Sequence, residues 1–228
     1  MIVGIGAAVV LAGGAAYGAF ERNSPLFGKP ITRLHGGRSV ALTFDDGPNP
    51  DATPRVLDAL AARGVKATFF ILGRHAERWP DLVRRVANEG HAVGNHGYYH
   101  RKLHFKSPAY VRRDLELGTQ AIVAAGGVRP RLFRAPHGFR SPWVTPIARS
   151  LGQRTVGWSL GVWDSDRPGV DAIVARTLEG TRPGSIPLLH DGDGYDLAGD
   201  RMQTAQAVPL IVDGLLAQGY RFERIEAA

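Results

Sequence analysis

The stretch VALTFDDGPNP, residues 40 to 50, decides the fold of this chain. Its first five residues, Val40 to Phe44, are apolar or β-branched and predict a buried strand. The strand ends in two adjacent carboxylates, Asp45 and Asp46, and Gly47-Pro48 then breaks it. Because two like charges at the end of an apolar strand repel each other, the arrangement indicates a positively charged partner for each of them.

Six further apolar runs of the same kind follow, most of them rich in β-branched or aromatic residues and bounded by Gly or Pro. They are ATFFIL at 67, HAVGN at 91, RLFRAP at 131, TVGWSL at 155, SIPLLH at 185 and YRFERI at 220. Helical patterns lie between them, at 53–64, 76–90, 107–127, 141–152, 170–180 and 202–219. Strands that alternate with helices of ten or more residues predict parallel βαβ units. About seven such units fit a (β/α) barrel or a doubly wound sheet.

The first helical pattern carries the clearest boundary signals. Thr53 is predicted as the N-cap, Pro54 as the first helical residue and Gly64 as the C-terminal stop. In the last pattern, Pro209 is expected to kink or restart the helix, because it has no backbone N–H to donate.

The N-terminal segment differs from the rest of the chain. Residues 1–20 carry no charged side chain, and as a helix they would just span a bilayer core of about 30 Å. We expect a membrane anchor or an export signal here, with a buried N-terminal helix as the alternative. Residues 21–38 read as a linker.

Composition excludes several classes of site. The 228 residues include no cysteine, which rules out a disulfide scaffold, a thiolate metal site and a cysteine nucleophile. The net charge of +7 favours anionic surfaces such as cell-wall polymers or phospholipid headgroups, or it is simply a solvated basic surface. The one local basic cluster, residues 100–106, lacks the repeated pattern of a nucleic-acid binder, so no nucleic-acid partner is expected.

Unusual polar residues gather at the C-terminal ends of the predicted strands. They are Asp45, Asp46, His96, His100, Arg134, Asp164, His190 and Asp191. Each alone has an ordinary explanation, such as a surface histidine, a structural ion pair or a turn. In a parallel barrel, however, these strand ends open on one face, where such folds place their active sites. Their joint occurrence therefore predicts a functional site.

Two histidines and a carboxylate form a three-ligand site suited to Zn²⁺, Co²⁺ or Fe²⁺. Such a metal lowers the pKa of bound water to about 7 and polarises a carbonyl group. A second carboxylate can act as general base, and a further histidine can protonate the leaving group. The set predicts a metal-assisted hydrolase of an acyl bond.

In order along the chain, the motifs TFDDGP, HGYYH, RAPHG, WSLGVWDS and LLHD resemble the polysaccharide deacetylase family, which is carbohydrate esterase family four. The resemblance runs from about residue 39 to residue 228, the predicted catalytic domain. It implies a distorted (β/α) barrel with about seven parallel strands and the active site at their C-terminal ends. It also implies a divalent metal, Zn²⁺ before Co²⁺.

The resemblance also implies roles for individual residues. Asp46, His96 and His100 resemble the metal ligands, and Asp45 resembles the catalytic base, held ionised by Arg134. His190 resembles the catalytic acid, and Asp164 its paired carboxylate. The substrate-binding positions are the backbone N–H of His137, as the oxyanion donor, Leu188 beside the acetyl methyl group, and Trp163.

Four positions depart from the family pattern. Gly97 replaces a usual Ser or Thr, His137 an aromatic residue, and Gly161 a common Asp. Ser165 stands where a Trp usually walls the acetyl pocket, a part that Trp163 or Trp143 could take over. Every residue with an expected chemical role is present, so these departures bear on which substrate is bound more than on the reaction.

The function expected is therefore removal of N-acetyl groups from an N-acetylglucosamine-containing glycan, of the peptidoglycan or chitooligosaccharide type. Two alternatives stay open: an O-acetyl polysaccharide esterase, and a catalytically silent glycan-binding domain. The expected place is the cell envelope, with the protein anchored or exported, and the alternative is the cytoplasm. The sequence leaves the oligomeric state open.

Overall fold

The computed structural model describes residue 13 and residues 17–226. Most of the predicted anchor or signal segment, residues 1–20, lies outside that range and stays a prediction. Within the described part of the chain, residues 17–20 are helical, and no helix is both long and apolar enough to cross a membrane.

A curled sheet of seven strands forms the centre of the domain. Its order is β6-β5-β4-β3-β2-β8-β7, and every neighbouring pair is parallel. The strands are β2 (Thr43–Asp45), β3 (Thr68–Ile71), β4 (Ala92–Asn95), β5 (Leu132–Phe133), β6 (Arg154–Thr155), β7 (Leu160–Gly161) and β8 (Pro187–His190). The predicted α/β fold with about seven parallel strands is confirmed.

The two edge strands of this sheet explain why it curls. The run TVGWSL does not form one strand but ends β6 and begins β7, which stand at opposite ends of the strand order. The chain from Thr155 to Leu160 spans at most about 18 Å when fully extended. The two edges must therefore come near each other, which bends the sheet into a distorted barrel.

The predicted strand at 220 joins a different sheet. β9 (Arg221–Phe222) pairs in parallel with β1 (Ser39–Val40), which forms the first part of the SVALTF run. The seven strands of the main sheet are thus not quite the seven apolar runs of the sequence. The first run divides between β1 and β2, the fifth divides between β6 and β7, and the last lies outside the main sheet.

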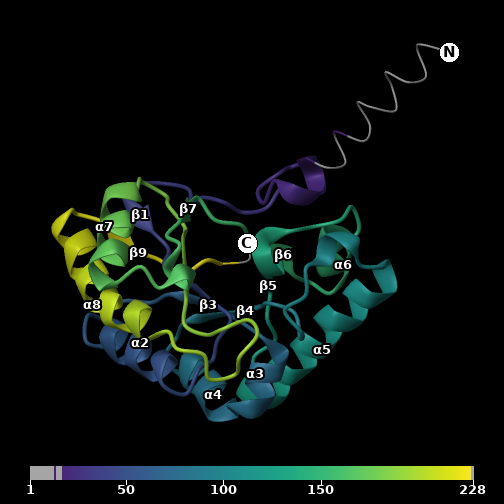
Figure 1. The fold of residues 1–228 in the computed structure, drawn as a ribbon, viewed down its shortest axis with the longest axis horizontal. Helices are drawn as coiled ribbons and strands as arrows, with labels where there is room; N and C mark the ends of the chain where they lie inside the picture. Colours follow the sequence, from purple (N-terminus) through teal and green to yellow (C-terminus); the bar gives the residue numbers. More distant parts are fainter. Residues whose placement is uncertain (1–12, 14–16, 227–228) are drawn as a thin grey trace.

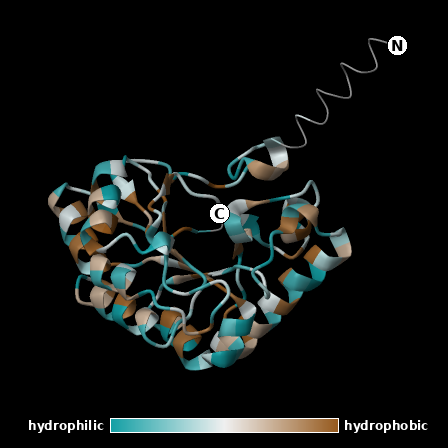
Figure 2. Cartoon of the chain, in the orientation of Figure 1, coloured by the Kyte–Doolittle hydropathy of each residue, from teal (hydrophilic) through white to brown (hydrophobic). Residues whose placement is uncertain are grey.

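Seven helices follow one another around the outside of the curled sheet (Figure 1). They are α2 (Ala52–Ala61), α3 (Gly73–Arg78), α4 (Pro80–Asn88), α5 (Pro108–Gly126), α6 (Val144–Ser150), α7 (Val170–Gly180) and α8 (Met202–Ala217). Three 3₁₀ turns lie in the loops: η1 (Leu103–Phe105), η2 (Pro136–Gly138) and η3 (Asp164–Asp166). Hydrophilic and hydrophobic faces lie side by side on the helices, as Figure 2 shows.

Three helix predictions needed refinement. The pattern at 76–90 forms two helices, because Trp79 leaves the helical conformation and Pro80 begins a new helix. Helix α8 continues through Pro209 as one element. Thr53 is not the N-cap of α2; the side chain of Asn49 accepts hydrogen bonds from the first N–H groups, and the Thr53 hydroxyl is directed to Asp191 instead.

The core fills the space between the strands and the helices. Phe44 and Phe69 stack with ring centroids 5.0 Å apart, and the inner faces of α2 and α8 are fully buried against them. Burial of this apolar surface stabilises the fold by roughly 25 cal/mol per Å². It also fixes the strand ends, and with them the polar side chains that follow each strand.

Residues 22–34, from the predicted linker, pack on the barrel. Ile31 forms a bridge with Val156, and the side chain of Asn23 donates to the Trp158 carbonyl at 2.7 Å. Arg140 is 2% exposed, and its guanidinium donates to the carbonyls of Ser24 at 2.6 Å and Gly28 at 2.7 Å. A buried cation thus depends on backbone acceptors from the N-terminal segment.

These contacts predict different outcomes for two truncations. A chain that starts at Tyr17 should keep its melting temperature. A chain that starts at Arg38 should melt about 10 °C lower, because the Arg140 guanidinium would lose the carbonyls of Ser24 and Gly28 and keep only the 3.4 Å contact with Thr145, a penalty of about 3–5 kcal/mol. Thermal unfolding followed by circular dichroism measures the difference. Arg140→Met in the shorter chain should recover part of the loss, and equal melting of the two chains would contradict the prediction.

Candidate active site

The predicted site residues come together at the C-terminal ends of the parallel strands. Asp45 ends β2 and pairs in register with His190, which ends β8. Both line a cavity of about 180 Å³. The other lining residues are Asp46, His96, His100, His137, Trp158, Ser165, Leu188, Asp193, Gly194, Tyr195 and Arg201.

Strained backbone is concentrated around this cavity. Asp46, His100, His137 and Trp163 all have left-handed conformations, with φ of 69°, 54°, 58° and 60°. For non-glycine residues such conformations cost about 1–3 kcal/mol each and persist only where the surroundings enforce them. At Asp46 the left-handed turn takes the chain out of the strand, so that its carboxylate and that of Asp45 meet different partners.

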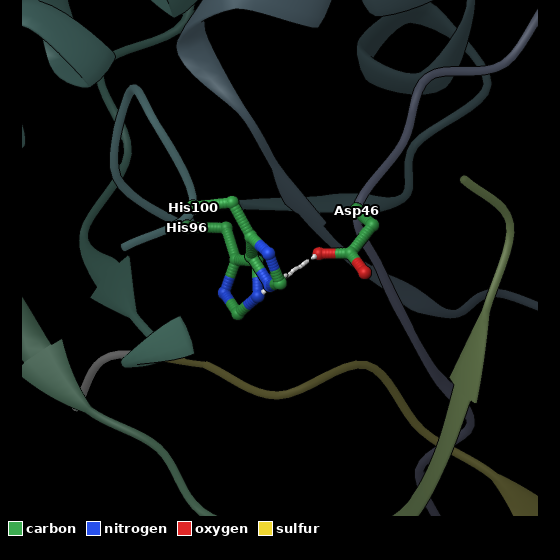
Figure 3. Close-up of side chains that lie close together, drawn as sticks. All are labelled: Asp46, His96 and His100. Carbon is green, nitrogen blue, oxygen red and sulfur yellow. Dashed lines mark ion pairs between the residues drawn. The ribbon is translucent and has the colours of Figure 1, made fainter. Parts of the chain in front are cut away.

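Asp46, His96 and His100 form a compact group of three donor atoms (Figure 3). Oδ1 of Asp46 lies 3.2 Å from Nε2 of His96 and 3.1 Å from Nε2 of His100, and all three side chains are buried. Nδ1–H of His96 donates to the carbonyl of Arg134 at 2.8 Å, so the lone pair of Nε2 faces Asp46. Oδ1 of Asp46 has no hydrogen-bond donor among the described residues.

The electrostatics of this group favour a cation. Burial alone would raise the pKa of Asp46, but the neighbouring imidazoles of His100 and His96 hold it far below its usual range. Burial lowers the pKa of His100 to about 3, so its ring is neutral at pH 7. For His96, the carboxylates of Asp45 and Asp46 outweigh burial and raise the pKa, which means that positive charge is favoured at its Nε2.

The donor set fits a divalent metal ion. Its three atoms lie within 4.8 Å of one another, and they are two imidazole nitrogens and one carboxylate oxygen. The loop at Gly194 passes so close to the His100 ring that a Cβ atom there would lie 2.0 Å from Nδ1. The chain therefore holds His100 against the site from the outer side.

Asp45 is paired with a buried arginine. Its Oδ1 accepts from Nη1 of Arg134 at 2.7 Å, and Asp45 and Arg134 are 3% and 0% exposed. The same guanidinium donates to Thr43 and to the carbonyl of Gly157, and it stacks 4.1 Å from the Phe70 ring centroid. Arg134 is thus fixed on several sides and holds Asp45 in one orientation at the cavity wall.

A second pair, Asp164 and His190, lies beside the first, because His190 of β8 is in register with Asp45 of β2. Asp164 accepts from Nδ1 of His190 at 2.9 Å and from its backbone N–H at 2.8 Å. Its carboxylate also accepts from the hydroxyl of Thr204 at 2.8 Å. Burial lowers the pKa of His190, but the charge of Asp164 outweighs it and raises the pKa to about 9. His190 therefore carries a proton at neutral pH.

The structure also locates the three residues expected to contact substrate. Leu188 and His137 line the cavity, and burial lowers the pKa of the His137 ring to about 4. Trp163 is 51% exposed and lines a second, adjoining cavity instead. Trp143 lies outside both cavities, where its Nε1 donates to the carbonyl of Lys106.

Comparisons with known proteins identify the family of this chain. Residues 33–156 match the family model "Polysaccharide deacetylase". A chitooligosaccharide deacetylase from Bradyrhizobium is 42% identical over 82% of this chain and 89% of its own length. A peptidoglycan-N-acetylglucosamine deacetylase from Bacillus cereus is 39% identical over 80% of this chain and 84% of its own. The chain belongs to the polysaccharide deacetylase family.

A solved structure adds a contrast within this family. It is a carbohydrate esterase family four pseudoenzyme from Bacillus anthracis, in a mutant with restored enzymatic activity. It matches with a TM-score of 0.79 and 30% identity over 89% of this chain and 70% of that chain. The fold of a polysaccharide deacetylase is therefore not sufficient evidence of catalysis, and the individual side chains decide.

One departure from the polysaccharide deacetylase pattern has a structural reason. Gly97 has φ of 80°, and a Cβ atom there would lie 2.4 Å from the Asp114 carboxylate. That carboxylate accepts from the backbone N–H groups of Tyr98 and Tyr99 at 3.2 and 3.1 Å. Asp114 thus orders the loop between the two histidines of the metal group, and only glycine leaves room for it.

Sequence reasoning missed several residues of this site. Trp158 lines the cavity next to Leu188 although Ser165 occupies the position of the usual Trp. The Tyr195 ring contacts the rings of His100 and His137, and its hydroxyl is 3.0 Å from Nε2 of His137. Trp158 lies within the apolar run TVGWSL, a signal that could have found it, whereas Tyr195 lies in a loop without periodicity.

Proposed function

We propose that this chain is a metal-dependent N-deacetylase of N-acetylglucosamine-containing glycans. The observation that carries the proposal is the distribution of charge around one cavity. A buried group of metal-ligand type shares one cavity with Asp45, which is paired with Arg134, and with His190, which is paired with Asp164. A pure binding site has no use for a base, an acid and a metal group together.

Asp46, His96 and His100 would hold the metal, and Zn²⁺ suits two imidazoles and a carboxylate best, with Co²⁺ as the second choice. A metal bound there would supply Lewis acidity toward the acetyl carbonyl and toward water. Asp45 accepts the proton of the attacking water, and Arg134 keeps this carboxylate ionised and oriented.

The leaving group needs a proton, because an amide nitrogen departs poorly as an anion. His190 donates that proton, and Asp164 holds the imidazole charged and fixes its orientation. The backbone N–H of His137 would stabilise the oxyanion, and Leu188 would border the acetyl methyl group. Trp163 would contact a part of the glycan beyond the acetyl group.

The two alternatives make different predictions. An O-acetyl polysaccharide esterase could use the same residues, but an ester does not require a strong acid for its leaving group. A catalytically silent glycan-binding domain, in line with the pseudoenzyme neighbour, would release no acetate. The names of the curated relatives favour amide substrates. Such substrates also favour a location at the cell envelope, which we propose for this protein.

Acetate release from a panel of substrates tests the proposal. The panel should hold chitooligosaccharides, peptidoglycan and acetylated xylan, each with and without a chelator. The proposal expects chelator-sensitive acetate from at least one of the first two. Acetate from xylan alone would favour the esterase, and none from any glycan would favour the silent domain.

The Asp164–His190 pair predicts a specific pH profile. A pKa raised to about 9 keeps His190 protonated below that pH, so activity should fall as the pH rises through this value. Asp164→Asn removes the charge that raises the pKa while burial still lowers it, so the basic limb should move down by about 1 pH unit or more. The pH dependence of kcat measures the shift.

Thr204→Val is the matched control, because it removes a neutral donor to Asp164 and leaves the carboxylate charge in place. Its basic limb should move much less than that of Asp164→Asn. Identical limbs in the wild-type protein and in Asp164→Asn would mean that His190 does not owe its charge to this pair.

A further inference from the structure

A second cavity of about 320 Å³ adjoins the active site. The two cavities share five lining residues: His137, Trp158, Ser165, Leu188 and His190. A substrate whose acetamide group lies against the metal group would therefore extend its next chemical group into the second cavity. What lines that cavity should decide which glycans are accepted.

The second cavity is lined by cations and by no carboxylate. Arg22 and Lys102 contribute two positive charges, whereas the charge of His190 is already paired with Asp164 at 2.9 Å. None of the remaining lining residues carries a negative charge. Two unpaired cations around a single small space repel each other unless an anion joins them.

Arg22 is held in place but not neutralised. Its guanidinium carbon lies 5.1 Å from the centroid of Trp163 and 5.9 Å from that of Trp158. Within residue 13 and residues 17–226, its guanidinium makes ring contacts but no hydrogen bond or ion pair, so its N–H groups are free for a ligand. Stacking on two rings leaves the edge of a guanidinium open to a carboxylate, which it can bind in a bidentate manner.

Lys102 completes the arrangement. Its side chain is exposed and its Nζ lies 5.9 Å from the centroid of Phe139, which also lines the cavity. Among the described residues it has no carboxylate partner. Lys102 and Arg22 thus present two free positive charges to the same space.

We propose that the second cavity binds a carboxylate on the part of the glycan next to the acetamide, so that acidic N-acetylated glycans are preferred over neutral ones. The inference rests on the proposed function, because it names the substrate class of the same site. It assigns Arg22 and Lys102 as specificity-determining residues, and it gives the N-terminal segment a part in substrate choice.

Calorimetric binding tests this inference independently of turnover. The ligands are a peptidoglycan glycan fragment with free lactyl carboxylates and the same fragment as its methyl ester. The metal-loaded Asp45→Asn protein is used, so that the ligand is not consumed. We expect the acid to bind about tenfold more tightly than the ester at low salt. Arg22→Gln with Lys102→Gln should reduce this ratio to about one.

Matched variants separate charge from structure. Arg38→Gln removes another arginine that stacks on an aromatic ring, 4.8 Å from the Tyr220 centroid, and should keep the tenfold ratio. Arg101→Gln removes the neighbouring exposed charge and should also keep it. Arg22→Lys preserves the charge and should retain most of the ratio that Arg22→Gln loses.

A glycan in which glucuronic acid alternates with N-acetylglucosamine, measured against its own methyl ester, shows which source of carboxylate is accepted. A preference for the acid in either pair supports the inference. Equal binding of acid and ester in both pairs would overturn it, whatever the acetate measurements give. A preference for the acid without any acetate release by the wild-type protein would instead contradict the proposed function.

Discussion

Asp45→Asn should lose acetate release by about 10³-fold and keep its metal. In the wild-type protein, Nη1 of Arg134 donates to Oδ1 of Asp45 at 2.7 Å. The amide oxygen of the variant can still accept this hydrogen bond, so the local structure should persist. It cannot, however, take a proton from water, and general-base catalysis contributes about 10²–10⁴-fold to rate. Metal content by mass spectrometry and acetate release at saturating metal measure both properties on one preparation.

Thr43→Val is the control for Asp45→Asn. It removes the other side chain that accepts from the same Arg134 nitrogen, at 2.8 Å, and leaves the base in place. Its loss of rate should be far smaller. If Asp45→Asn lost its metal, or regained activity with added metal, Asp45 would be a ligand rather than the base.

Asp46→Asn should fail in the opposite way. Its carboxylate supplies the one negative charge between His96 and His100, so the metal dissociation constant should rise about 10²-fold or more. Asparagine tolerates left-handed backbone, here φ of 69°, and the fold should not change. Part of the activity should therefore return in excess metal. Retention of metal at wild-type affinity would show that the carboxylate is not a ligand.

The opposite outcomes of these two variants follow from the strand end that carries both acids. Successive side chains of a strand point to opposite faces, so neighbouring carboxylates cannot share one partner. Asp45 still belongs to β2, whereas Asp46 has already turned into the left-handed conformation. Each carboxylate thereby reaches its own positive partner, which offsets their mutual repulsion.

Much of this arrangement was predictable from the sequence, because it depends on strand ends. A buried parallel strand is a short apolar run, and the polar residue that ends it must lie at one edge of the sheet. Asp45, Asp46, His96, Arg134 and His190 all follow this rule. For these residues, the position at the end of an apolar run in the sequence also gives the position at the edge of the sheet.

The parts that the sequence did not reveal depend on long-range packing. Arg22 lines the second cavity only because the segment from 22 to 34 lies back on the barrel, held by Arg140 and by the bridge at Ile31. Such a segment has no periodicity and reads as a linker. The split of TVGWSL between two edges of the sheet likewise follows from barrel curvature, which no local propensity encodes.

Metal stoichiometry and acetate release of the wild-type protein, measured before and after metal removal, test the proposed chemistry most directly. We expect one divalent metal per chain, acetate release from a peptidoglycan or chitooligosaccharide substrate, loss of that activity with the metal, and its return on adding Zn²⁺ or Co²⁺. The same rate of acetate release from the metal-free and the reloaded protein would contradict a metal-dependent deacetylase at Asp46, His96 and His100.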